Sequence, residues 1–253
     1  MASVYDRADI YDLLENESRY QVYKKHWEAV LGSRNIRTFL DVSIGSGNVT
    51  LPLADLGIRL YGSDLNRTML AKCREKAQAR KLDVDLQCCD FREVGNRFDR
   101  KFDCVGSTGD SLPHVSNEDI LKTLEQMDSL VKPGGYLYFD MRNWDRILKE
   151  RQRFYLYNPF FNGDTRINLI QVWDYHEDGT MTFNLLYTFE KDNRIFHKEK
   201  FEEHYIPVNK EFLLNKVRDM GYEDIKIMNF PAIVPDIPTD EMEWYCAIAR
   251  KSE

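Results

Sequence analysis

Thr38-Phe39-Leu40-Asp41-Val42-Ser43-Ile44-Gly45-Ser46-Gly47 is the stretch that decides how this chain folds. Its first half is a short apolar run, which is typical of a buried strand. Its second half is small and flexible, and residues 49–54 begin a predicted helix that tolerates Pro52 in its first turn. Glycines let a backbone pass close to a ligand, and a helix start offers N–H groups without intrahelical partners. A strand, a glycine-rich turn and a helix therefore predict half of a nucleotide-binding unit.

An acidic residue follows the next apolar run at the distance that such a unit requires. Residues 58–63 form the second predicted strand, and Asp64 comes directly after it. A carboxylate about 20 residues beyond the glycine turn is placed to accept hydrogen bonds from both hydroxyls of a ribose. The alternative is an ordinary tight turn and an Asp on the surface. The turn also departs from the dinucleotide pattern Gly-x-Gly-x-x-Gly, because Ser43 stands where a third glycine would.

Helices and strands alternate along most of the chain. Further helices are expected at residues 5–31, 66–81, 117–131 and 210–220, and further strands at 84–89, 102–107, 136–141, 225–230 and 243–249. Three aromatic-rich alternating runs differ from this pattern and are separated by hairpin signals; they span residues 167–176, 180–190 and 195–206. They predict an antiparallel meander, inserted after the fifth strand and covering the site.

Charge and composition narrow the class of protein. The chain has 253 residues, of which 43% are hydrophobic, enough for one good-sized core with an appendage. Its net charge of −7 argues against nucleic-acid or anionic-membrane partners, which bind basic patches. The sequence starts without an apolar signal region, and no run approaches the roughly 20 apolar residues of a membrane span. We therefore expect a cytoplasmic protein.

The chain contains five cysteines, an odd number without metal-type spacing: Cys73, Cys88, Cys89, Cys104 and Cys246. Most of them stand among apolar neighbours, so buried reduced thiols are expected. The histidines of the meander (His176, His197, His204) have no ligand-like spacing with an acid pair. We predict no metal.

Two loops and the glycine turn carry a resemblance to a known family. The turn resembles motif I of class I S-adenosylmethionine (SAM)-dependent methyltransferases, Asp/Glu-x-Gly-x-Gly-x-Gly. Residues 109–114, Gly-Asp-Ser-Leu-Pro-His, look like the Gly-Asn-Ser-Phe-Ala-His loop of glycine N-methyltransferases. Residues 132–145 look like the same family's Pro-Gly-Gly…Asp-His-Arg-Asn-Tyr-Asp segment. Weaker similarities are the Arg19…Tyr23-Lys24 pattern and Tyr205-Ile206-Pro207.

The resemblance implies a fold and a division of the chain. The fold is α/β, a doubly wound, mostly parallel seven-stranded sheet with an N-terminal helical cap and an inserted antiparallel meander. The implied parts are a cap at 1–35, a SAM-binding core at 36–152, a β lid at 153–207 and the rest of the core sheet at 208–253.

SAM is the implied cofactor, and S-adenosylhomocysteine (SAH) the implied product. Arg19 is expected to contact the SAM carboxylate. Asp90 would accept a bond from the adenine amine and Phe91 would lie against the ring, the alternative for Asp90 being a plain turn residue. The full set of expected cofactor residues is Arg19, Tyr23, Asp41, Ser43, Gly45, Gly47, Asp64, Leu65, Asp90, Phe91, Thr108 and Gly109.

The implied reaction is methyl transfer to the amine of a small carboxylate-bearing substrate, similar to glycine or sarcosine. Arg142 stands where the family holds the substrate carboxylate, a pairing that is strong when bidentate and desolvated. Asp110 replaces the family's Asn, and we hypothesise that it suits an acceptor with more methyl groups or a different nucleophile. His114 is the candidate general base, although packing and backbone bonding explain it as well. The remaining expected substrate contacts are Tyr11, Tyr20, Asn143 and Tyr205.

Two other functions stay open. One is methylation of oxygen, sulfur or an aromatic amine on another small molecule, with Arg142 serving structure. The other is a SAM-binding protein without catalysis. We expect a monomer or a homodimer in either case.

Overall fold

The computed structural model describes residues 3–233, 235 and 237–253. Seven strands form the main sheet in the order β11-β12-β5-β4-β1-β2-β3. Their bounds are β1 Thr38–Asp41, β2 Arg59–Asp64, β3 Val84–Cys88, β4 Phe102–Ser107, β5 Val131–Arg142, β11 Tyr222–Asn229 and β12 Trp244–Lys251. Strands β1 to β5 pair in parallel, whereas β12 is antiparallel to both of its neighbours. This is the doubly wound sheet that the sequence predicts.

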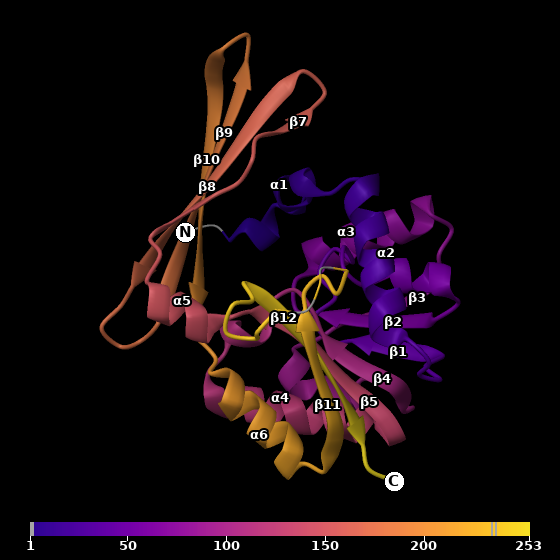
Figure 1. Ribbon diagram of the computed structural model, residues 1–253. Coiled ribbons are helices and arrows are strands. Elements are labelled where there is room, and N and C mark those ends of the chain that lie inside the picture. The colour runs from indigo at the N-terminus through magenta and orange to yellow at the C-terminus, as the bar shows by residue number, and fades with distance from the viewer. Residues whose placement is uncertain (1–2, 234, 236) are drawn as a thin grey trace.

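Helices cover both faces of the main sheet (Figure 1). Their bounds are α2 Glu17–Leu31, α3 Arg67–Ala79, α4 Asn117–Leu130 and α6 Lys210–Asp219. Each begins after a residue whose side chain accepts a backbone N–H bond from the first turn, namely Asn16, Asn66, Ser116 and Asn209. Apolar side chains of α2 and α3 pack in one core cluster, and those of α4 and α6 pack in another. The sheet therefore separates two hydrophobic layers.

Two predicted helices are wrong in detail. Residues 5–31 are not one helix, because the chain forms η1 Val4–Asp6, α1 Ala8–Tyr11 and η2 Asp12–Leu14 before α2 begins. The break comes at Asn16, whose backbone is extended so that its side chain can cap α2. The helix after the glycine turn is only a 3-10 segment, η3 Leu51–Leu56, which ends at the left-handed Gly57.

A second, wholly antiparallel sheet carries the predicted meander. Its strands are β6 Phe154–Leu156, β7 Phe160–Asn162, β8 Thr165–Tyr175, β9 Met181–Lys191 and β10 Arg194–Tyr205, and they follow α5 Trp144–Glu150. Strands β8, β9 and β10 match the three predicted runs, while the short β6 and β7 are additional. Figure 1 shows this sheet standing away from the main one, with α1 near the space between them.

Four of the five cysteines are buried and Cys88 is exposed. The prediction of buried thiols is therefore wrong for Cys88, which ends β3 at the edge of the main sheet. All five are free thiols. Within the described part of the chain, no helix is long and apolar enough to cross a membrane.

Candidate active site

Two adjoining cavities open at the carboxyl ends of the parallel strands. The first, which we call the core cavity, has a volume of about 370 Å³ and is lined mainly by the loops after β1, β2 and β4. The second, the lid cavity, has a volume of about 430 Å³ and lies among α2, the end of β5 and the second sheet. Residues of the N-terminal segment and the β4 loop line both: Tyr5, Tyr11 and Gly109, with Asn48, Val49 and Glu203. The two cavities therefore share a wall, of which Gly109 is one part.

Asp64 lies on the wall of the core cavity and ties two loops together. Its Oδ2 accepts a bond from Gly45 N at 2.9 Å, and its Oδ1 accepts one from Asn66 N at 2.8 Å. Gly45 has a φ of +54°, a left-handed conformation that favours glycine. Burial raises the pKa of Asp64 above its ordinary value, and the backbone N–H groups oppose that shift. The carboxylate is thus fixed in direction while it faces the cavity.

Asp41 is fully buried beneath the loops and does not line the cavity. It accepts bonds from Ser43 N at 3.0 Å, from Thr108 Oγ1 at 2.7 Å and from the hydroxyl of Thr50. Burial raises the pKa of Asp41 to about 6. Gly47 is also away from the wall; its φ is +81°, and a Cβ there would come within 2.7 Å of Leu51 Cγ. Both residues hold the loop in place rather than face the cavity.

Ser43, Thr108 and Gly109 line the core cavity. Ser43 Oγ accepts a bond from Thr108 N at 3.1 Å and lies 2.9 Å from Ser107 Oγ. The hydroxyl that replaces a glycine of the motif therefore joins the loop after β1 to the loop after β4. Leu65 and Phe91 are also on this wall, and Leu65 is 68% exposed.

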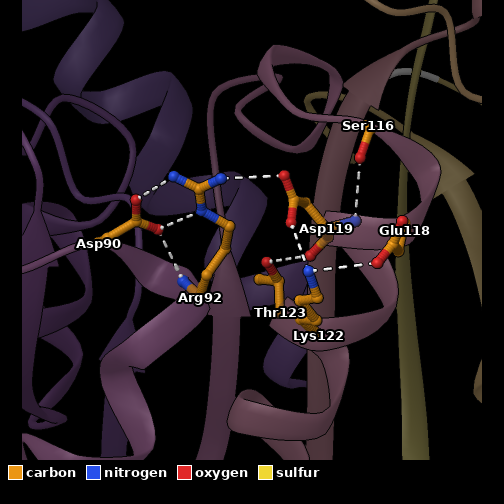
Figure 2. A network of polar contacts seen from close by, with 7 residues as sticks. All are labelled: Asp90, Arg92, Ser116, Glu118, Asp119, Lys122 and Thr123. Atoms are coloured by element: carbon orange, nitrogen blue, oxygen red, sulfur yellow. Dashed lines mark hydrogen bonds and ion pairs between the residues drawn. The ribbon is translucent and has the colours of Figure 1, made fainter.

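Asp90 is turned away from the core cavity. Its carboxylate accepts bonds from the backbone N, Nε and Nη2 of Arg92, whose Nη1 reaches Asp119 at 2.9 Å (Figure 2). The hydrogen bond with Arg92 holds the pKa of Asp90 below its usual value. In this conformation Asp90 caps η4 Phe91–Asn96, and three of its acceptor positions are taken by Arg92.

Arg142 lines the lid cavity and is only 8% exposed. Its guanidinium carbon lies 4.7 Å from the ring centre of Trp244 and 5.4 Å from that of Phe183, distances at which cation–π attraction is appreciable. Its Nε lies 3.5 Å from Asp110 Oδ2, and Asp110 Oδ1 accepts bonds from Arg142 N and Trp144 Nε1. Burial raises the pKa of Asp110 to about 7. The pair is held rigidly at the cavity wall.

Of the predicted substrate contacts, Tyr11 and Tyr205 line the lid cavity, together with the expected cofactor residues Arg19 and Tyr23. Tyr20 does not: its ring lies 3.6 Å from the guanidinium carbon of Arg80, in a separate depression beside α3. Asn143 does not line it either. Its Nδ2 donates to Thr239 O and Met242 O, and its Oδ1 caps α5.

His114 uses both ring nitrogens within the protein. Nδ1 lies 3.1 Å from the carbonyl oxygen of His204, which can only accept, so Nδ1 carries the proton. Nε2 then accepts from the hydroxyl of Tyr5 at 3.0 Å. Burial lowers the pKa of His114 to about 4. The ring connects the β4 loop to the N-terminal segment and to β10, and its basic nitrogen is occupied.

Replacing His114 with Gln should lower kcat by less than about tenfold, because the lost bonds are structural. The pH–rate profile should keep its shape, since a ring with a pKa near 4 does not titrate around neutrality. Steady-state rates between pH 5.5 and 9 measure both. A loss of about a hundredfold or more, together with a vanished acid limb, would instead identify His114 as the base.

Sequence reasoning missed several residues of the lid cavity. Tyr155, Tyr157 and Tyr187 come from the second sheet, and Trp244 comes from the start of β12. The aromatic alternation of the meander was a signal for Tyr187. Tyr155 in β6 and Tyr157 just after it lie far in the sequence from Trp244 of β12, and only the folded chain brings them together.

Several known proteins that resemble this chain are methyltransferases. A family model described as a methyltransferase domain matches residues 39–135. A glycine/sarcosine N-methyltransferase from Aphanothece halophytica is 27% identical over 87% of this chain and 78% of its own length. A glycine/sarcosine/dimethylglycine N-methyltransferase from Actinopolyspora halophila is 24% identical over 95% of this chain, which spans only 40% of that protein. A SAM-dependent methyltransferase from Clostridium acetobutylicum has a similar fold, with a TM-score of 0.77 at 17% identity over 97% of this chain and 98% of that one.

The fold, the matched domain and these relatives together support a class I SAM-dependent methyltransferase. The same findings support an enzyme, a methyltransferase.

Proposed function

We propose that this methyltransferase transfers the methyl group of SAM to the amine of a small acceptor that carries a carboxylate, similar to glycine or sarcosine. The observation that carries the proposal is Arg142, a buried arginine on the wall of a cavity that adjoins the cofactor loops. Similarity to glycine and sarcosine N-methyltransferases over most of the chain supports the same substrate class.

SAM is proposed to bind with its adenosine in the core cavity and its sulfonium near Gly109. Asp64 would accept bonds from the ribose hydroxyls, Leu65 and Phe91 would flank the adenine, and Arg19 would receive the methionine carboxylate from the lid cavity. SAM supplies an activated methyl group on a good leaving group. The protein's part is therefore mainly to align the two reactants, which contributes a large share of the rate in such displacements.

The acceptor is proposed to occupy the lid cavity. Arg142 would pair with its carboxylate and so aim its amine toward Gly109. The tyrosines of this cavity present ring faces and hydroxyls, which favour a nitrogen that becomes cationic as it gains a methyl group. The second sheet, residues 153–207, would act as a lid over this cavity, since β6, β8, β9 and β10 contribute to its lining.

The test is a panel of acceptors incubated with SAM, scored by release of SAH. Glycine, sarcosine and dimethylglycine represent carboxylate-bearing amines, and phenols and thiols represent the alternative acceptors. We expect turnover with at least one amine of the first group. Turnover confined to acceptors without a carboxylate would establish the alternative, a methyltransferase for other small molecules. Repeating the panel with Asp110→Asn shows whether this acid selects among the methylation states.

A further inference from the structure

A chain of buried hydrogen bonds leads to Gly109, one of the residues that line both cavities. The backbone N of Ala232 lies 2.9 Å from His26 Nδ1, and His26 Nε2 lies 3.0 Å from the hydroxyl of Tyr138. That hydroxyl lies 3.1 Å from Asp140 Oδ2, while Asp140 Oδ1 accepts a bond from Gly109 N at 2.8 Å. His26, Tyr138 and Asp140 are at most 1% exposed. None of the three lines either cavity.

The direction of each bond follows from the first one. A backbone N–H only donates, so His26 Nδ1 must accept from Ala232 and carries no proton. Burial lowers the pKa of His26 to about 3, so the ring is neutral and its proton is on Nε2. His26 therefore donates to the Tyr138 hydroxyl, which must in turn donate to Asp140. Both oxygens of Asp140 thus receive a donor, which suits an ionised carboxylate.

Negative charge outweighs positive charge in the interior around this point. Among the described Asp, Glu, Lys and Arg residues, those classed as buried are Asp41, Asp110, Asp140, Glu203 and Arg142. Burial raises the pKa of Asp140 well above its ordinary value, the Gly109 N–H opposes that shift, and the charges of Asp41 and Asp110 raise it further. Asp110 is already paired with Arg142. Asp140 has hydrogen-bond donors but forms no ion pair with the residues that the structure describes, so a cation at Gly109 would complement it.

We propose that Asp140 positions the Gly109 loop and, through its negative charge, makes the enzyme prefer cationic SAM over its neutral product SAH. Tyr138 donates to Asp140 and His26 donates to Tyr138, so both favour the ionised form of Asp140 against the burial that disfavours it. This rests on the proposed place of the cofactor at Gly109. Methyl transfer converts the sulfonium to a thioether, so the attraction to Asp140 is lost at that step and release of SAH becomes easier.

The test compares dissociation constants for SAM and SAH, measured by calorimetry on the Asp140→Asn variant. The two ligands share every group except the methyl and the charge. We expect SAM to bind on the order of tenfold more weakly, as for one screened charge a few ångströms away. SAH should change by less than about threefold. An equal loss of affinity for SAM and SAH, or no loss for either, would overturn the proposal. A disturbed structure, in contrast to a lost charge, would weaken the binding of both ligands.

Tyr138→Phe provides a second variant in case Asp140→Asn does not fold. It removes one hydrogen-bond donor from Asp140. The preference for SAM over SAH should therefore also fall, by about threefold. Tyr222→Phe is the matched control, because Tyr222 also donates to a carboxylate, Asp128, but away from both cavities. An unchanged preference in Tyr138→Phe would count against the proposal. Failure of the cofactor placement itself is recognised separately, because Asp64→Ala would then leave both dissociation constants unchanged.

Discussion

Replacing Asp64 with Ala is expected to raise the dissociation constant for SAM by about a hundredfold or more. The carboxylate is proposed to hold two ribose hydroxyls, and hydrogen bonds to a charged group contribute about 1.5–3 kcal/mol each. The loss should be the same for SAH, since the ribose is common to both ligands. Calorimetric titration with each ligand measures the effect.

The structure adds a second reason for this large effect. Without the carboxylate, the N–H groups of Gly45 and Asn66 lose their acceptor, and the loops after β1 and β2 lose one of the contacts between them. Asp64→Asn separates the two contributions, because it keeps one oxygen acceptor without the charge. Asp85→Ala, on the exposed edge strand β3, is the control for a lost surface acid. An unaltered dissociation constant in Asp64→Ala would refute the placement of SAM in the core cavity.

Replacing Arg142 with Lys is expected to lower kcat/KM for a carboxylate-bearing acceptor by about a hundred- to a thousandfold. Lysine keeps the charge but cannot form the planar, two-point contact of a guanidinium. It would also fit poorly among Trp173, Phe183 and Trp244, whose rings surround the guanidinium at 4.7–5.6 Å. The dissociation constant for SAM should stay within about threefold, because Arg142 does not line the core cavity.

Arg151→Lys is the matched control for the Arg142 prediction. Arg151 also lies over an aromatic ring, that of Tyr175 at 4.5 Å, but it lines neither cavity. We expect its kcat/KM to stay close to that of the unaltered enzyme. The decisive comparison uses an acceptor without a carboxylate. If Arg142→Lys impairs turnover of that acceptor just as strongly, Arg142 supports the cavity structurally and does not bind the acceptor's carboxylate.

The sheet and the cofactor-side loops were predictable because their signals are local. Gly45 and Asp64 are separated by one helical segment and one strand, and parallel pairing of β1 with β2 brings them to the same edge. The hairpin signals at Asp178-Gly179 and Asp192-Asn193 fixed the turns of the meander in the same way, since positive φ is needed at Gly179, Asp192 and Asn193.

Other features depend on packing that no local pattern records. Tyr20 and Tyr23 are three residues apart on α2, yet Tyr20 faces Arg80 while Tyr23 faces the lid cavity. Asp41 belongs to the motif, but burial and three hydrogen bonds place it under the loops. Arg92 donates to Asp90 and also to Asp119 of α4, so the position of Arg92 depends on how η4 packs against α4. Such pairings are decided by the three-dimensional arrangement of elements distant in sequence.

The walls of the two cavities are encoded in largely separate stretches of the chain. The core cavity is built mainly from residues 42–111, whereas the lid cavity takes many of its side chains from residues 155–205. Substitutions in the later stretch can therefore reshape one cavity while leaving most of the other wall untouched. If SAM and the acceptor occupy the two cavities as proposed, evolution can change the acceptor through substitutions in the second sheet and leave most of the proposed SAM site unaltered.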